Sequence, residues 1–409
     1  MEVLYQSCAG LDVHKDTVVA CVRRGAGRKV DHEVSTFGTT TTELLALAAW
    51  LTEQECTHVV MEATGVYWKP VWHVLDGAFE LLLANPMHVK NVPGRKTDVN
   101  DATWLSDLLA HGLISGSFVP PEPIQDLRAL TRTRKQFLRD KTRQVQRLHK
   151  TLEDANIKIT GAISDLMGKS GRAFLNALIA GETDPEKLVE LRDARLRAPR
   201  KQLVEALRGR VTSNHRLHLK LHFAQVLAIE EAVATIDAEV EVLLRPFAEA
   251  VSRLKEIPGI RQITAQMLVA ELGVDMSRFA TVGHLISWAG LCPRQDESAG
   301  KRRSTKTRKS ACWLKNALIE AAWAAANTRG SYLRAQFLRL RTRRGPKKAI
   351  VAVAASMLTA VYFMLREGTE YQDLGAHHFE QIDRRKTAGR LVRKLQELGY
   401  EVDVKDNAA

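Results

Sequence analysis

The stretch YQSCAGLDVHKDTVVACVRR, residues 5–24, predicts two β-strands joined by a tight turn. Small and β-branched apolar residues fill Tyr5–Val13 and Thr17–Arg23, and the polar residues between them are typical of a hairpin. A third β-rich stretch covers Val30–Phe37, and the continuous apolar run CTHVVMEA, residues 56–63, is typical of a strand that is buried on both faces. We therefore expect a mixed β-sheet.

Helical patterns alternate with these strands. Thr39–Thr42 offer N-caps for a helix through Trp50, a short helix is expected around Tyr67–Leu75, and a fifth strand covers FELLLANP, residues 79–86. A helix from Thr97 to His111 follows a Pro-Gly loop. The predicted order is β-β-β-α-β-α-β-α, which makes residues 1–118 an α/β domain.

Four carboxylates occupy special places in this order. Asp12 ends the first strand, Glu62 ends the buried fourth strand, and Asp98 and Asp101 lie three residues apart on one face of the last helix. If the first and fourth strands are neighbours, a helix packed across their ends would bring all four carboxylates together. Hard oxygen ligands of this kind select Mg²⁺, with Mn²⁺ as the alternative, and a two-metal site suits phosphoryl transfer.

Each of these acids alone is commonplace in a chain with 47 Asp and Glu residues, and an Asp in a first helical turn is a favourable dipole placement. The combination favours the catalytic interpretation, because acids on strand one, strand four and the final helix of this β-α order resemble the ribonuclease H-like nucleases, and specifically Holliday-junction resolvases.

The remainder of the chain is predicted to be mainly helical. A proline-rich break at residues 120–123 precedes a long helix, 124–157, and an apolar heptad predicts a second long helix at 216–254, so that the two form one pair within the chain or one dimer. The uncharged stretch 349–365 is expected to be a buried helix rather than a membrane span. We thus predict a helical, coiled-coil domain at 119–254, a mainly helical C-terminal domain at 255–366 and a tail at 367–409 with a helix at 387–398 and a short strand.

Composition points to a polyanionic partner. The 409 residues carry a formal net charge of +13. The five cysteines are scattered, which indicates neither a zinc site nor a disulfide framework, and the N-terminus lacks a secretory signal. We expect a cytoplasmic protein, associated with the nucleoid when it is bound to DNA, and no membrane partner.

Basic residues that would contact nucleic-acid backbone fall into three groups. The first flanks the carboxylates, the second lies along the helix 124–157, where a solvated coiled-coil face is the alternative, and the third lies in and near a polar loop of the C-terminal domain. They are Lys15, Arg95 and Lys96; Arg128, Arg132, Arg134, Lys135, Arg139, Arg143 and Arg147; and Arg261, Lys301, Arg302, Arg303, Lys306, Arg308 and Lys309.

The polar loop reads RQDESAGKRRSTKTRKS, residues 294–310. A hydroxyl such as that of Ser298, set among guanidinium and ammonium groups, can attack a phosphodiester because those cations stabilise the developing negative charge. Basic loops more commonly make phosphate contacts alone, and no neighbouring His is an obvious base. Local chemistry therefore leaves both roles open for Ser298.

Several longer phrases, in this order along the chain, resemble the DEDD-type insertion-sequence transposases, which are bridge-RNA-guided recombinases. The phrases are GLDVHKD (10–16), VVMEATGVYW (59–68), GRKTDVNDA (94–102), IPGIRQITAQMLVAELG (257–273), RFATVGHLISWAGLCP (278–293) and SAGKRRSTKTRKS (298–310). The resemblance covers about 6–115 and 254–320.

This resemblance implies a magnesium-binding tetrad of Asp12, Glu62, Asp98 and Asp101, and a nucleophilic Ser298 that forms a covalent phosphoserine link to DNA. It also implies a homo-oligomer, a dimer or tetramer, in which the serine of one subunit meets the tetrad of another. A noncoding guide RNA would pair with both donor and target DNA.

Two features depart from the family pattern. Pro258-Gly259-Ile260 resembles a helix-hairpin-helix turn, but Arg261 replaces the second Gly, and Lys309-Ser310-Ala311 replaces the usual Lys-Gly-Asn. Two alternatives stay open: a resolvase-like nuclease in which metal-activated water attacks, and an inactive relic that only binds nucleic acid.

Overall fold

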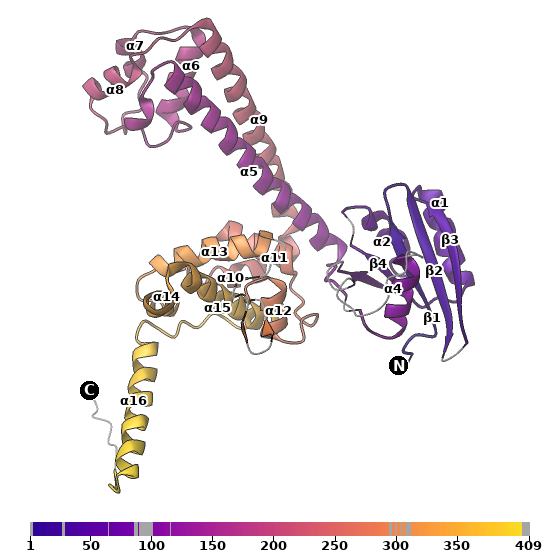
Figure 1. Ribbon diagram of the computed structural model, residues 1–409. Helices are drawn as coiled ribbons and strands as arrows, with labels where there is room; N and C mark the ends of the chain where they lie inside the picture. Colours follow the sequence, from indigo (N-terminus) through magenta and orange to yellow (C-terminus); the bar gives the residue numbers. More distant parts are fainter. Residues whose placement is uncertain are drawn as a thin grey trace. The chain divides into compact units, whose positions relative to one another are not determined.

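A computed structural model describes residues 3–402 except 27–28, 64, 86–88, 90–100, 115, 294–296, 299–300, 303, 305 and 308–311. The chain divides into two compact units, Met1–Val119 and Pro120–Ala409 (Figure 1). This division leaves open how the second unit splits further, so the predicted boundaries near 254 and 366 stay predictions.

A five-stranded sheet organises the first unit, and its order is β3-β2-β1-β4-β5. β1 pairs antiparallel with β2 and parallel with β4, so the predicted mixed sheet is confirmed. The first and fourth strands are neighbours, which is the condition on which the clustering of the carboxylates depends. The turn between β1 and β2 closes through a bond from the His14 amide to the Thr17 carbonyl (2.9 Å). The strands are Ser7–Val13 (β1), Thr17–Ala26 (β2), Lys29–Gly38 (β3), His58–Glu62 (β4) and Glu80–Ala84 (β5).

Helices cover both faces of the sheet. Thr41–Glu53 (α1) and Trp68–Leu75 (α2) pack on one face, and Asp101–Ala110 (α4) packs on the other. β4 contributes Val59 and Met61 to the first core and Val60 to the second, which explains why its sequence is continuously apolar. The predicted order of strands and helices is confirmed.

The second unit contains a long pair of helices, Glu122–Asp154 (α5) and Ser213–Leu243 (α9). They lie side by side in one chain (Figure 1), and their distal ends share an apolar core with the short helices between them. Arg134 forms an ion pair with Asp237, and Lys141 and Arg172 both pair with Glu230 at 2.7 and 2.6 Å. The short helices are Lys169–Ala180 (α6), Pro185–Glu190 (α7) and Arg200–Leu207 (α8), with a 3₁₀ turn at Ile159–Gly161.

The prediction that the second long helix continues to residue 254 was wrong. α9 ends at Leu243, and a 3₁₀ turn, Arg245–Phe247, separates it from Ala248–Leu254 (α10). The physical reason is Pro246, which has no N–H to donate to the carbonyl four residues before it and whose ring collides with that carbonyl.

The C-terminal helices pack around the apolar helix Pro346–Glu367 (α15), whose inward face includes Val353, Met357 and Leu358. α15 alone among the described residues is long and apolar enough to cross a membrane, and half of its most apolar window is buried inside the protein. The predicted buried helix is confirmed. Its neighbours are α10, Val282–Trp288 (α12), Cys312–Asn327 (α13) and Tyr332–Arg344 (α14), and Gln262–Leu272 (α11) packs against α10 and α13.

The tail helix is longer than the sequence pattern predicted. His378–Glu397 (α16) begins well before the expected residue 387, and Tyr332 of α14 stacks on Phe379 near its start (ring centroids 5.1 Å apart). The described residues that follow, up to Val402, form no strand, so the predicted short strand is not found there.

Candidate active site and nucleic-acid interface

Asp12 and Glu62 lie at neighbouring positions of the sheet. β1 and β4 are parallel with Leu11 opposite Met61, so the next residues along the two strands are Asp12 and Glu62. Neighbouring strands are about 4.8 Å apart. The carboxyl ends of both strands therefore meet at one edge of the sheet.

The two acids also share a face of the sheet, because side chains alternate along a strand. Gly10, two residues before Asp12, faces α4: a Cβ on Gly10 would lie 2.2 Å from the Ala102 carbonyl oxygen. Val60, two residues before Glu62, belongs to the core on the α4 side. By this alternation Asp12 and Glu62 both lie on the face that α4 covers.

The direction of α4 brings its N-terminus to the same edge. Ala102 packs over Gly10, whereas the carbonyl of Ala110 at the other end accepts a bond from the Leu4 amide near the start of β1 (2.8 Å). The helix thus runs opposite to β1 and begins beside the strand's carboxyl end. Asp101 is the first residue of α4, so it lies at the edge that carries the two strand acids.

Two residues of the turn after β1, His14 and Lys15, lie beside Asp12 at this edge. His14 Nε2 lies 3.2 Å from Asp12 Oδ2, and its side chain is largely exposed to solvent. Lys15 is exposed next to it. The other predicted members, Asp98, Arg95 and Lys96, lie outside the described residues.

The donor chemistry at this edge fits a hard divalent cation. Asp12, Glu62 and Asp101 offer carboxylate oxygens, which are the ligands that Mg²⁺ and Mn²⁺ prefer. Within the described part of the chain, no three His, Cys, Asp or Glu side chains are grouped closely enough to hold a metal ion. The described thiols of this unit are unsuitable for such a role, since burial raises the pKa of Cys8 to about 12 and of Cys56 to about 11.

Ser298 lies in a short hairpin rather than in a plain loop. Glu297–Ser298 (β6) and Lys301–Arg302 (β7) pair antiparallel, with Ser298 opposite Lys301. Lys301 and Lys306 are exposed. The side chains of Ser298 and Arg302, and the whole of Arg303, Arg308 and Lys309, lie outside the described part of the structure.

The basic residues of α5 have partners within the protein. Arg132 donates two bonds to the carboxylate of Glu271, both 2.8 Å long, and Arg128 donates to the Glu271 carbonyl (2.7 Å). Burial lowers the pKa of Arg128 to about 10. Arg134 pairs with Asp237, and Lys135 with Glu320 (3.0 Å). Much of the positive charge along the first half of α5 is therefore neutralised by α9, α11 and α13.

The remaining predicted contacts of α5 are more open to solvent. Arg139 lies over the ring of Trp313, 5.1 Å from its centroid, Arg143 pairs with Asp140 one turn away, and Arg147 is exposed. These three are the α5 residues that remain best placed to meet a nucleic acid.

Replacing Glu271 by Gln is expected to destabilise the second unit by about 3 kcal/mol, because it leaves two guanidinium groups without their buried counter-charge. The Glu271 side chain is 3% exposed. The midpoint of urea unfolding of the full chain, followed by helical circular dichroism, measures this change. Glu320→Gln is the matched control: that side chain is 64% exposed, so its pair with Lys135 contributes less than about 1 kcal/mol. Equal shifts for both variants would contradict the structural role given to Glu271.

The turn Pro258-Gly259-Ile260, which resembles that of a helix-hairpin-helix motif, joins α10 and α11. Gly259 adopts φ +89°, and a Cβ there would lie 2.3 Å from the Ala321 carbonyl oxygen of α13. The turn therefore packs against α13 on its glycine side. Arg261, the N-cap of α11, is exposed and extended, so it can contact a phosphate through charge.

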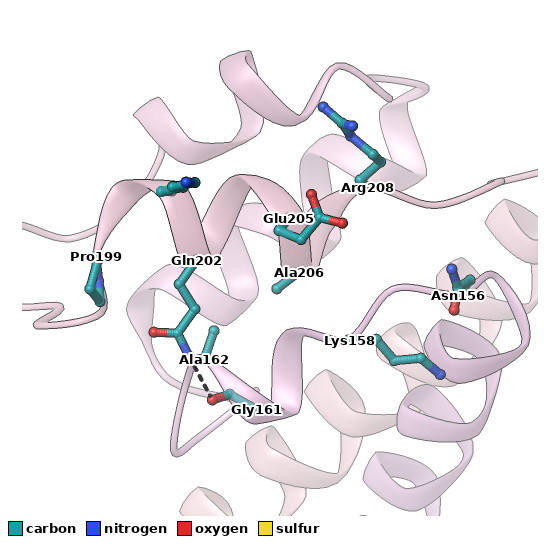
Figure 2. Close-up of a pocket in the computed structure, with 10 residues that line it drawn as sticks. Asn156, Lys158, Gly161, Ala162, Pro199, Gln202, Glu205, Ala206 and Arg208 are labelled. Atoms are coloured by element: carbon teal, nitrogen blue, oxygen red, sulfur yellow. Dashed lines mark hydrogen bonds between the residues drawn. The ribbon is translucent and has the colours of Figure 1, made fainter.

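A cavity of about 650 Å³ lies at the far end of the α5–α9 pair, between α8 and the 3₁₀ turn after α5 (Figure 2). The Gln202 amide donates to the Gly161 carbonyl across it (3.3 Å), and Lys158 and Glu205 also line it. Its lining contains neither His nor Cys and no group of carboxylates. We assign this cavity no part in catalysis.

Comparison with protein families agrees with this geometry. Residues 9–157 match the model of a transposase family of the DEDD type. Residues 251–338 match the model of the transposase IS116/IS110/IS902 family. No curated protein matches the chain. The first matched segment includes the edge that carries the acids, and the second includes Ser298.

Proposed function

Since the chain belongs to the IS116/IS110/IS902 family and is a DNA transposase with a DEDD domain, we propose that it recombines DNA through the four carboxylates and Ser298. Asp12, Glu62, Asp98 and Asp101 would hold Mg²⁺ or Mn²⁺. When bound, the cation supplies positive charge beside the scissile phosphate. The observation that best supports this is the shared edge and face of Asp12 and Glu62 beside the start of α4.

The proposed chemistry has two steps, cleavage and rejoining, and in each step one P–O bond forms while another breaks. The Ser298 Oγ gives up its proton and bonds to phosphorus, one backbone P–O bond breaks, and the leaving DNA oxygen takes a proton. After strand exchange, the hydroxyl end of the new partner strand attacks the phosphoserine and releases Ser298. Lys301, opposite Ser298 in the hairpin, would stabilise the negative charge that develops in both steps.

Partners follow from the same proposal. Donor and target DNA are the substrates, and the resemblance of the motifs implies a noncoding guide RNA that selects both by base pairing, inside the cytoplasm. The serine and the tetrad would come from different subunits of a dimer or tetramer.

Trapping on DNA tests the serine step. Wild type is incubated with duplexes from the sequence that flanks its gene, with transcripts of the neighbouring noncoding region and with Mg²⁺, and is then denatured in detergent. We expect a protein–DNA adduct that Ser298→Ala abolishes and that Ser304→Ala, in the same segment, retains. Cleavage without an adduct would support the resolvase-like alternative in which water attacks. An adduct with Ser298→Ala would contradict the role of Ser298 and assign the covalent link to another residue.

A further inference from the structure

Five exposed cations surround the turn between α14 and α15. Arg341, Arg343 and Arg344 lie in the last turn of α14, and Lys347 and Lys348 lie in the first turn of α15. We call these five residues the α14–α15 basic turn. None of them forms an ion pair with a residue that the structure describes.

The surrounding sequence offers no local counter-charge. Residues 321–366 contain neither Asp nor Glu. In the first half of α5, by contrast, Arg128, Arg132 and Arg134 are held by acids of other helices. Among the residues that the structure describes, no ion pair therefore neutralises the charge of the α14–α15 basic turn.

Helix stability explains the positions of the three arginines but not those of the two lysines. Cations at a helix C-terminus are favourable by about 0.3–1 kcal/mol, which suits the three arginines of α14. Lys347 and Lys348 lie at the N-terminus of α15, where the helix dipole is positive and the same effect is unfavourable. Gly345, with φ +77°, forms the turn that brings both groups together.

We infer that the α14–α15 basic turn is a contact surface for the phosphate backbone of double-stranded DNA. Residues 338–348 contain no aromatic side chain, and Phe337, over whose ring Arg341 lies, is buried, so neither offers an open ring face on which an unpaired base could stack. Clustered Arg and Lys side chains bind duplex DNA by displacing condensed counterions. The patch lies just beyond the segment 251–338 that matches the family. This inference rests on the proposed function, in which DNA is the substrate.

The test is the salt dependence of DNA binding. The full chain is titrated with a fluorescent random-sequence DNA duplex and, separately, with duplex and single-stranded RNA, in EDTA, at several NaCl concentrations. The variant carries Arg343→Gln, Arg344→Gln, Lys347→Gln and Lys348→Gln. Loss of four phosphate contacts should make the slope of log K against log salt shallower by about 3–4 and weaken binding on the order of 100-fold at about 0.15 M salt. Its melting temperature should be nearly unchanged, because the two unfavourable charges removed from the start of α15 offset the two favourable charges removed from the end of α14.

A control variant removes the same number of charges from exposed residues of the α8 region: Arg195→Gln, Arg197→Gln, Lys201→Gln and Arg208→Gln. An equal loss of affinity in the control would show that only the net charge of the protein matters, and it would overturn the inference. So would an unchanged salt slope in the first variant, or a loss that affects only duplex or single-stranded RNA. Because no metal is present, catalysis does not enter: a wild type that fails to bind DNA counts against the proposed function, whereas normal binding by the variant counts only against this surface.

Discussion

Asp12→Asn is expected to lower the rate of DNA strand cleavage by at least about 1,000-fold, which corresponds to about 4 kcal/mol of lost transition-state stabilisation. The amide keeps the size of the side chain but removes the negative charge that a divalent cation requires. Asp12 lies at the exposed edge of the sheet beside Glu62 and carries little of the core, so the fold should survive. Single-turnover cleavage in Mg²⁺ measures the rate, and thermal melting checks the fold.

Asp16→Asn is the control for this prediction. Asp16 lies in the same hairpin and is exposed, but it follows the end of β1 and lies outside the predicted tetrad. It should keep cleavage within about threefold of wild type, since a change of that size is under 1 kcal/mol. If Asp12→Asn retained most of the activity, Asp12 would not be a metal ligand. A wild type with no cleavage in any divalent metal would favour the inactive relic.

Gly10→Ala is expected to destabilise the first unit by about 3 kcal/mol and to reduce cleavage with it. The new methyl group would lie 2.2 Å from the Ala102 carbonyl oxygen and 2.6 Å from the Ser106 amide nitrogen, both backbone atoms of α4. No side-chain rotation relieves such contacts, so the helix must move away from β1. Asp101, the first residue of α4, would move with it.

Gly38→Ala provides the comparison. Its nearest neighbour would be Glu43 Cγ at 3.1 Å, part of a flexible side chain, so the cost should stay under about 1 kcal/mol. Thermal melting and cleavage are measured for both variants. If the sheet tolerates no alanine in place of glycine, both variants lose stability; if the close packing of α4 is the cause, only Gly10→Ala does. Wild-type melting of Gly10→Ala would show that α4 packs less closely than the structure indicates.

Local patterns predicted the first unit well because its elements are encoded locally. The β-branched stretches, the turn residues after Asp12 and the apolar run ending at Glu62 each mark one strand, and the adjacency of β1 and β4 placed two acids side by side. The close packing of α4 on β1 requires a glycine at position 10. This requirement could not be predicted from the local sequence, because it depends on a helix about 90 residues further along the chain.

Long-range pairing explains what the sequence did not reveal. A count of cations along α5 favoured nucleic-acid contact, but the counter-charges of Arg128 and Arg132 come from Glu271, about 140 residues away. The α14–α15 basic turn was overlooked for the opposite reason. Its signal is the absence of Asp and Glu over residues 321–366, and this becomes meaningful because the described part of the folded chain supplies no ion pair to these cations either.

The α5–α9 pair has a mechanical consequence. At 1.5 Å per residue, the 33 residues of α5 span about 50 Å, and ion pairs to Asp237 and Glu230 hold the two helices together along this length. A helix pair joined in this way would tilt as one stiff body. A tilt of about 10° at its base would carry the far end, with α6, α7 and α8, through about 9 Å, as the length from the helical rise requires. Small rearrangements around Glu271, near the base, are therefore magnified at the tip.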